Sequence, residues 1–255
     1  MQLNRELLLA TLDAQKQALA ICQPCIRDPD DDSNGSATAM AAGLLRNVAV
    51  TSFSLEPNAL KFRELLAESA ELRLSLFDRY SAGEPIDDSF LTIISYQAVL
   101  DALAAHRSDI AKSFAPHLTG RETLNRKHCH KFDRTIGYAI LAAISDSQNA
   151  TDLSADFIDY CGSNGNGSFV GYATFLDGII NRDSQAVEAG TQGIIKAHKR
   201  LSGNGIFRGT PDELLCVWGI GLCFLARLKG LTVDLDHPLI PAVLLVSGSQ
   251  AEAMG

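Results

Sequence analysis

The feature of this sequence that most constrains its fold is the segment Leu215–Leu225, which contains no charged residue. A helix made of such residues is apolar on every side, and a helix of that kind belongs at the centre of a fold. Residues typical of helix ends flank the segment, with Thr210 as the N-cap, Pro211 as the first helical residue, Glu213 as the capping-box partner, and Lys229 and Gly230 at the end. The sequence therefore predicts a central helix over Pro211–Lys229.

Two glycines inside this predicted helix, Gly219 and Gly221, indicate how it packs. A glycine within a helix costs about 1 kcal/mol relative to alanine. That cost makes sense where neighbouring helices cross at close range. Trp218, the only tryptophan of the chain, is accordingly expected in the core.

Apolar residues spaced by three and four predict helices along most of the remaining chain. The clearest covers Pro57–Ala82, with Pro57 in its first turn and Gly83 at its stop. Others are expected near residues 2–22, 38–54, 88–105, 107–115, 131–146, 151–161, 168–181 and 184–201. Residues 231–235 are expected to be extended. The predicted fold is all-α: a single domain over residues 1–255, with about ten helices arranged as stacked antiparallel hairpins such as 168–181 with 184–201.

Composition and charge narrow the class of partner. Hydrophobic residues make up 46% of the chain and charged residues 20%, which excludes a disordered protein. The net charge of −8 argues against nucleic acid as a partner and permits a basic protein. The longest apolar run, Leu214–Ala226, is shorter than the roughly 20 residues that span a bilayer. Residues 1–12 show no signal-peptide pattern, so we expect a cytoplasmic protein, without a membrane partner, whose six cysteines are reduced thiols.

Motifs that could carry chemistry are incomplete. The Cys22–Cys25 pair (CxxC) lacks a second pair, and the adjacent residues of His128–His130 would point in different directions on a helix. The glycine-rich stretch Gly162–Gly167 lacks the Lys-Ser/Thr of a P-loop, and the acidic stretch Asp28–Asp32 lacks the later glutamate of a calcium loop. We therefore expect no metal site, no cofactor, no catalytic residues and no enzymatic activity.

The distribution of charge is more informative than these motifs. Residues 105–134 carry seven Lys or Arg against three acids, whereas residues 146–190 carry seven acids against Arg182 alone. Within the acidic stretch, Asp152, Asp156 and Asp159 step by four and three, so one helix would present them on one face. These three residues and Asp177 are the candidate binding residues for a basic partner. The alternative is a solvated acidic face with no partner.

Three segments in the last third of the chain carry a family resemblance. They are Asp212–Gly219, Leu225–Leu231 and His237–Leu245, and the predicted helix with Ile194, Ile195 and His198 precedes them. Over roughly residues 185–245 the chain resembles bacterial immunity proteins that neutralise polymorphic toxins, and it is most similar to the Immunity protein 49 family. Upstream of residue 185 the likeness is one of helical character and length.

The resemblance implies an all-helical cytoplasmic immunity protein that binds a cognate toxin (effector) domain, encoded by a neighbouring gene, and blocks its active site. The matched residues are interpreted as structural: Trp218 as core, and His198 as either buried or at an interface. The toxin's chemistry stays open among nuclease, ADP-ribosyltransferase and deaminase. Two other interpretations also stay open: a helical scaffold or adaptor with no toxin partner, and an enzyme whose helical site has no familiar pattern.

Overall fold

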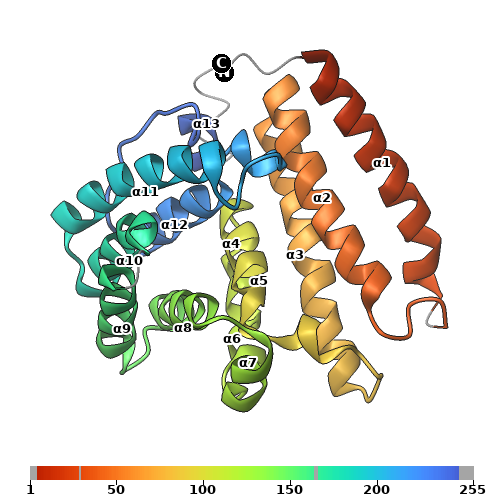
Figure 1. Ribbon diagram of the computed structural model, residues 1–255, viewed down its shortest axis with the longest axis horizontal. Helices are drawn as coiled ribbons and strands as arrows, with labels where there is room; N and C mark the ends of the chain where they lie inside the picture. Colours follow the sequence, from red (N-terminus) through yellow and green to blue (C-terminus); the bar gives the residue numbers. More distant parts are fainter. Residues whose placement is uncertain (1–4, 29, 164–165, 247–255) are drawn as a thin grey trace.

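The computed structural model of the chain describes residues 5–28, 30–163 and 166–246 (Figure 1). These residues form four short 3-10 turns, η1 to η4, and α-helices at α1 (Arg5–Arg27), α2 (Ser36–Leu55), α3 (Ala59–Ser81), α4 (Tyr96–Ala104), α5 (Ser108–Ser113), α6 (Ala115–Leu118), α7 (Glu122–His128), α8 (Lys131–Ser145), α9 (Ala150–Gly162), α10 (Val170–Asn181), α11 (Ser184–Asn204), α12 (Val217–Leu228) and α13 (Ala242–Leu245). Within this part of the chain there is no β-strand, only one isolated antiparallel bridge between His237 and Ile240. The predicted all-α fold is confirmed.

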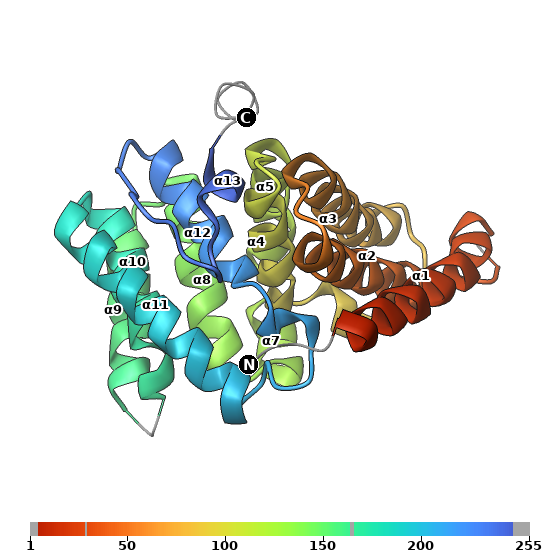
Figure 2. The same cartoon turned by 90° about the horizontal axis from the view of Figure 1, so that it is seen from above.

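The helices are arranged in three groups, which both views show (Figures 1 and 2). Helices α1, α2 and α3 stack side by side at one end of the molecule, and α9, α10 and α11 stack at the other. Between them lie α4, α5, α8 and α12. One continuous hydrophobic core runs through all three groups. No helix in the described ranges combines the length and apolar character that crossing a membrane requires.

Helix α12 lies at the centre, as its apolar sequence predicts. Nine of its twelve residues are buried, Trp218 among them. The ring of Trp218 packs edge-on against Tyr96, Tyr172 and Phe207. A Cβ atom at Gly221 would lie 2.5 Å from the backbone oxygen of Leu100 in α4. The predicted close crossing is therefore confirmed, because no side chain fits between α12 and α4 at this point.

The predicted start of this central helix is wrong. Pro211–Glu213 form the 3-10 turn η4, and the helix begins only at Val217. The backbone N–H of Cys216 donates to the carbonyl oxygen of Leu239 at 2.8 Å. This bond to the closing segment of the chain replaces a helical hydrogen bond and separates η4 from α12. Thr210 makes no side-chain cap, because its hydroxyl donates to the carbonyl oxygen of Phe207.

The other predicted helices are largely confirmed, with small shifts at their ends. Helix α3 begins at Ala59, so Pro57 lies before its first turn and not in it. Asn58 is the N-cap and accepts a hydrogen bond from the N–H of Lys61 at 2.9 Å. The hairpin of α10 and α11 is confirmed: Arg182 turns the chain with a φ of 58°, and Asp183 caps α11.

Two features between residues 88 and 128 were not expected. The helix predicted near 88–105 is interrupted by η1 (Asp88–Leu91) and η2 (Ile93–Ser95) before α4 begins, and helix α7 lies in a stretch with no predicted helix. The buried side chain of Asn125 in α7 accepts a hydrogen bond from the N–H of Ile93 at 2.8 Å and donates to the hydroxyl of Tyr138 at 2.9 Å. This tertiary contact joins η2, α7 and α8.

The continuous hydrophobic core agrees with the predicted single-domain bundle. Its boundaries at residues 1 and 255 stay a prediction, because residues 1–4 and 247–255 lie outside the described part of the chain. No helix or strand covers residues 231–235, which were predicted to be extended. They are followed by the short helix α13, which was not expected.

Candidate functional site

The structure places three of the four predicted binding residues together. Asp152, Asp156 and Asp159 all lie on the exposed side of α9, at the end of the molecule opposite α1 (Figure 1). The buried residues of this helix, Ala150, Ser154, Phe157 and Cys161, lie on its other side. None of the three carboxylates pairs with a cation or accepts a hydrogen bond from any residue that the structure describes.

Asp177 does not share this face. It lies half-buried on α10, where it accepts hydrogen bonds from the hydroxyl of Ser154 at 3.1 Å and from the side-chain amide of Asn181 at 2.9 Å. At 3.6 residues per turn, Ser154 is about 200° around α9 from Asp152. Asp177 therefore contacts the inner side of α9 and joins α9 to α10, whereas the other three aspartates point outward.

A shallow surface pocket of about 440 Å³ lies beside the exposed aspartates. It is lined by Asp156, Asp159 and Tyr160 of α9, by Lys131 and Thr135 of α8, and by Ser163. The ammonium group of Lys131 lies 5.6 Å from the centre of the Tyr160 ring, a cation–π contact. Lys131 is thus held near the aromatic ring, and Asp156 and Asp159 lie at the edge of the same pocket.

Asp146 and Asp183, like Asp177, have partners, whereas Glu188 is exposed on α11 and has no ion pair among the described residues. Asp146 forms an ion pair with Lys229 at 2.6 Å and lies 3.8 Å from Arg182. The hydrogen bond from Lys229 is the main reason why the pKa of Asp146 lies below the usual range, and the charges of Lys229 and Arg182 add to it. Asp183 caps α11. Apart from Glu188 on α11, the structure therefore separates this stretch into structural carboxylates and the three unpaired aspartates of α9. We call these three residues the α9 aspartate face.

The acidic loop Asp28–Asp32 also proves to be structural at its last residue. Asp32 is 1% exposed and accepts hydrogen bonds from the N–H of Ala37 and from Arg79, both at 2.7 Å, and from the hydroxyl of Thr38. Burial alone would raise the pKa of Asp32, but these hydrogen bonds outweigh it and hold the pKa below the usual range. This carboxylate anchors the start of α2 to α3.

A buried charge network, which the sequence analysis missed, joins the N-terminal helices to the segment that carries the resemblance. Arg46 of α2 donates to Asp101 of α4 at 2.9 Å and to Asp212 of η4 at 2.8 Å. Burial disfavours the charge of Arg46, but the two carboxylates outweigh it and raise its pKa. Burial raises the pKa of Asp101 to about 6 against the opposing attraction of Arg46. A single charged residue within an apolar helical run, such as Asp101 between Leu100 and Ala102, was the sequence signal that could have indicated this network.

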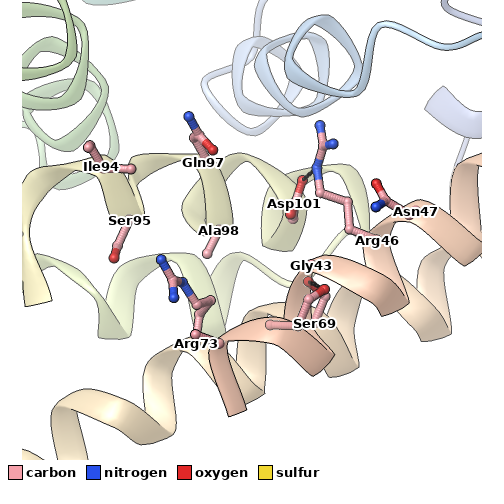
Figure 3. Close-up of a pocket in the computed structure, with 12 residues that line it drawn as sticks. Gly43, Arg46, Asn47, Ser69, Arg73, Ile94, Ser95, Gln97, Ala98 and Asp101 are labelled. Atoms are coloured by element: carbon pink, nitrogen blue, oxygen red, sulfur yellow. Dashed lines mark hydrogen bonds and ion pairs between the residues drawn. The ribbon is translucent and has the colours of Figure 1, made fainter. Parts of the chain in front are cut away.

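A polar pocket of about 260 Å³ opens beside this network, between α2, α3 and α4 (Figure 3). Arg46 and Asp101 form one part of its lining, and Arg73 of α3 forms another. Asn47, Ser69 and Gln97 also line it. The hydroxyl of Ser69 donates a hydrogen bond to the carbonyl oxygen of Ala42 at 2.8 Å. This pocket is the second candidate site, and nothing in the local sequence pattern pointed to it.

The cysteines and histidines singled out from the sequence are scattered. Cys22 and Cys25 lie near the end of α1, and Cys129 lies between α7 and α8. Across the three described ranges, no group of three or more His, Cys, Asp or Glu side chains is placed to hold a metal ion. The glycine-rich stretch Gly162–Gly167 lies partly outside those ranges. Gly162 is the last residue of α9, and Gly167 is the first residue of η3 (Gly167–Phe169).

Two residues of the resembling segment are core residues. Trp218 is 6% exposed and His198 is 1% exposed. The ring of His198 packs against Phe207 with 4.8 Å between ring centres, and burial lowers the pKa of His198. Of the two places considered for His198, the structure gives the buried one.

Comparisons of the chain with protein-family models, with curated proteins and with solved structures find no match. The resemblance to the Immunity protein 49 family therefore stays a prediction. The two candidate sites, the α9 aspartate face and the polar pocket between α2, α3 and α4, rest on the geometry described above.

Proposed function

We propose that this protein is a cytoplasmic immunity protein that binds and neutralises a cognate bacterial toxin domain and has no catalytic activity of its own. The kind of partner in this proposal comes from the resemblance of residues 185–245. The way it binds comes from the surface: we propose that the toxin docks against the α9 aspartate face and that this contact occludes the toxin's active site.

The observation that carries the proposal is the unpaired state of Asp152, Asp156 and Asp159. Three exposed carboxylates on one helix face, with no cation paired to them in the described chain, produce a local negative potential. Such a potential accelerates encounter with a basic surface and fixes the orientation of docking.

Occlusion suits this surface better than chemical reversal of the toxin's product. Blocking an active site requires only a complementary surface and enough buried area, about 800 Å² on each partner in a standard interface. Exposed apolar side chains can extend the contact beyond the charges: Ile158 on α9 is 40% exposed and Val170 at the start of α10 is 44% exposed. A charged rim around such apolar residues is the usual composition of a transient interface.

The test is neutralisation in cells together with co-purification. The toxin domain encoded by the neighbouring gene is expressed alone, with this protein, and with a variant carrying Asp152→Lys, Asp156→Lys and Asp159→Lys. We expect the protein to restore growth and to co-purify with the toxin, and the variant to do both less well. If the wild-type protein fails to bind or protect against that toxin, the immunity function is wrong and the scaffold or adaptor interpretation takes its place.

A further inference from the structure

The polar pocket between α2, α3 and α4 is open because its walls are built from small residues. Ala39, Ala42, Gly43 and Ala98 form much of its lining. A Cβ atom added at Gly43 would meet no other atom within 4 Å. Its volume of about 260 Å³ corresponds to roughly nine water molecules at about 30 Å³ each. The pocket therefore has room for a small molecule.

The cationic group on its wall, Arg73, is unlike its neighbour Arg46. The guanidinium of Arg46 is saturated by Asp101 and Asp212. That of Arg73 forms no hydrogen bond and no ion pair with any residue in the described ranges, and its central carbon lies 5.5 Å from the centre of the Phe90 ring. Figure 3 shows it directed across the pocket toward Ser95 and Ala98.

The guanidinium of Arg73 is partly buried and has no acceptor in the described chain. Burial of this side chain lowers the pKa of Arg73, and the opposing attraction of Asp101 does not outweigh it. A guanidinium has five N–H donors in a fixed planar fork. Partial burial weakens the hydration of this fork, and an acceptor from outside the chain would take the place of the water that reaches it.

We propose that this pocket binds a small monocarboxylate, whose carboxylate group pairs with the guanidinium of Arg73. The planar fork of arginine matches the two oxygens of a carboxylate. The formal charges of Arg46, Arg73, Asp101 and Asp212 sum to zero, so the site accepts one added negative charge more readily than a dianion such as phosphate. The amide of Asn47, which has no hydrogen-bond partner among the described residues, can meet a second polar group of the ligand. This site is separate from the α9 aspartate face and does not depend on the toxin.

The experiment titrates the full-length protein with acetate, propanoate and butanoate, with inorganic phosphate as the comparison anion. Side-chain Nε–H signals of arginine are followed by NMR, and thermal unfolding is measured at the same concentrations. We expect at least one acid to shift the Arg73 signal saturably. At ten times its Kd it should raise Tm by about 3 °C. Phosphate should bind at least tenfold more weakly.

Two variants test separately the guanidinium of Arg73 and the space of the pocket. Arg73→Met removes the guanidinium and keeps most of the stem, and Gly43→Leu fills the pocket and leaves Arg73 in place. Both should abolish the saturable shift and the rise in Tm, while Arg126→Met, which removes an exposed cation on α7, should bind as the wild type does. Circular dichroism verifies that each variant is folded. The proposal is overturned if none of the three acids binds the wild-type protein, if binding persists in either pocket variant, or if phosphate binds as tightly as the acids.

Discussion

Helices α3 and α9 carry the same pattern of three exposed carboxylates, four and three residues apart. On α3 they are Glu64, Glu68 and Glu71, and on α9 they are Asp152, Asp156 and Asp159. Figures 1 and 2 show the two helices in opposite groups of the bundle. Read from the sequence alone, the two sets are equivalent acidic faces.

The structure separates them by their surroundings. Glu64 lies 3.5 Å from the ammonium group of Lys61, and Glu71 lies 3.2 Å from the guanidinium of Arg107. The α9 set has no paired cation among the residues that the structure describes. Paired charges cancel over a short distance, whereas unpaired charges act over about a Debye length, near 8–10 Å at physiological salt. The spacing of acids therefore identifies a face, and the cations folded against that face decide whether it can attract a partner.

The largest effect on stability is expected when the cation partner of a buried carboxylate is removed. Arg46→Met should destabilise the protein by about 3 kcal/mol, because Asp101 and Asp212 lose their shared partner and the buried carboxylate of Asp101 must take up a proton. Urea unfolding measures the loss. Lys61→Met, which removes the partner of an exposed carboxylate, is the control and should cost under about 1 kcal/mol. Equal losses in the two variants would contradict the structural role given to the Arg46 network.

A second buried carboxylate should show its role through pH. The folded-state pKa of Asp32 is lower than its ordinary value near 3.9, so its contribution to stability is complete above that value. The contribution is lost as pH falls through the lowered pKa. We expect Asp32→Asn to cost about 2 kcal/mol at pH 7 and less at lower pH, where the wild-type carboxylate is itself protonated. A difference between the two proteins that stays constant from pH 7 to pH 3 would refute this assignment.

Asp177 should fall between the buried and the exposed carboxylates. Asp177→Ala removes two hydrogen bonds and leaves the hydroxyl of Ser154 without its acceptor, so we expect a loss of about 1 kcal/mol. Asp156→Ala is the matched control on α9, because it removes a carboxylate with no partner. Thermal unfolding of both variants should show a lower Tm for Asp177→Ala alone.

The smallest effects on stability are expected from neutralising the two exposed faces. Changing the three α9 aspartates to Asn should alter the free energy of unfolding by less than about 0.5 kcal/mol, because only weak repulsion between like charges is removed. Changing the three α3 glutamates to Gln should cost slightly more, since two exposed ion pairs are lost. A loss above 2 kcal/mol for the α9 variant would show that its aspartates are structural.

The sequence predicted the parts of this molecule that depend on local pattern. The central apolar helix, the hairpin of α10 and α11, and the shared face of Asp152, Asp156 and Asp159 all follow from spacing along one helix. The late start of α12 was not predictable, because Cys216 bonds to Leu239 in the closing segment of the chain. The inward position of Asp177 and the polar pocket at Arg73 likewise depend on how separate helices pack, which periodicity does not encode.

The most direct test of the central claim is the rate at which the protein associates with its proposed partner, a toxin domain encoded by a neighbouring gene. Stopped-flow measurements at about 50 and 200 mM salt compare the wild type with two charge-matched variants: the three α9 aspartates changed to Lys, and the three α3 glutamates changed to Lys. We expect the α9 variant to associate at least tenfold more slowly at low salt, with a smaller difference at high salt, and the α3 variant to stay within about threefold of the wild type. Equal rates for the two variants would show that net charge, and not the α9 aspartate face, governs binding.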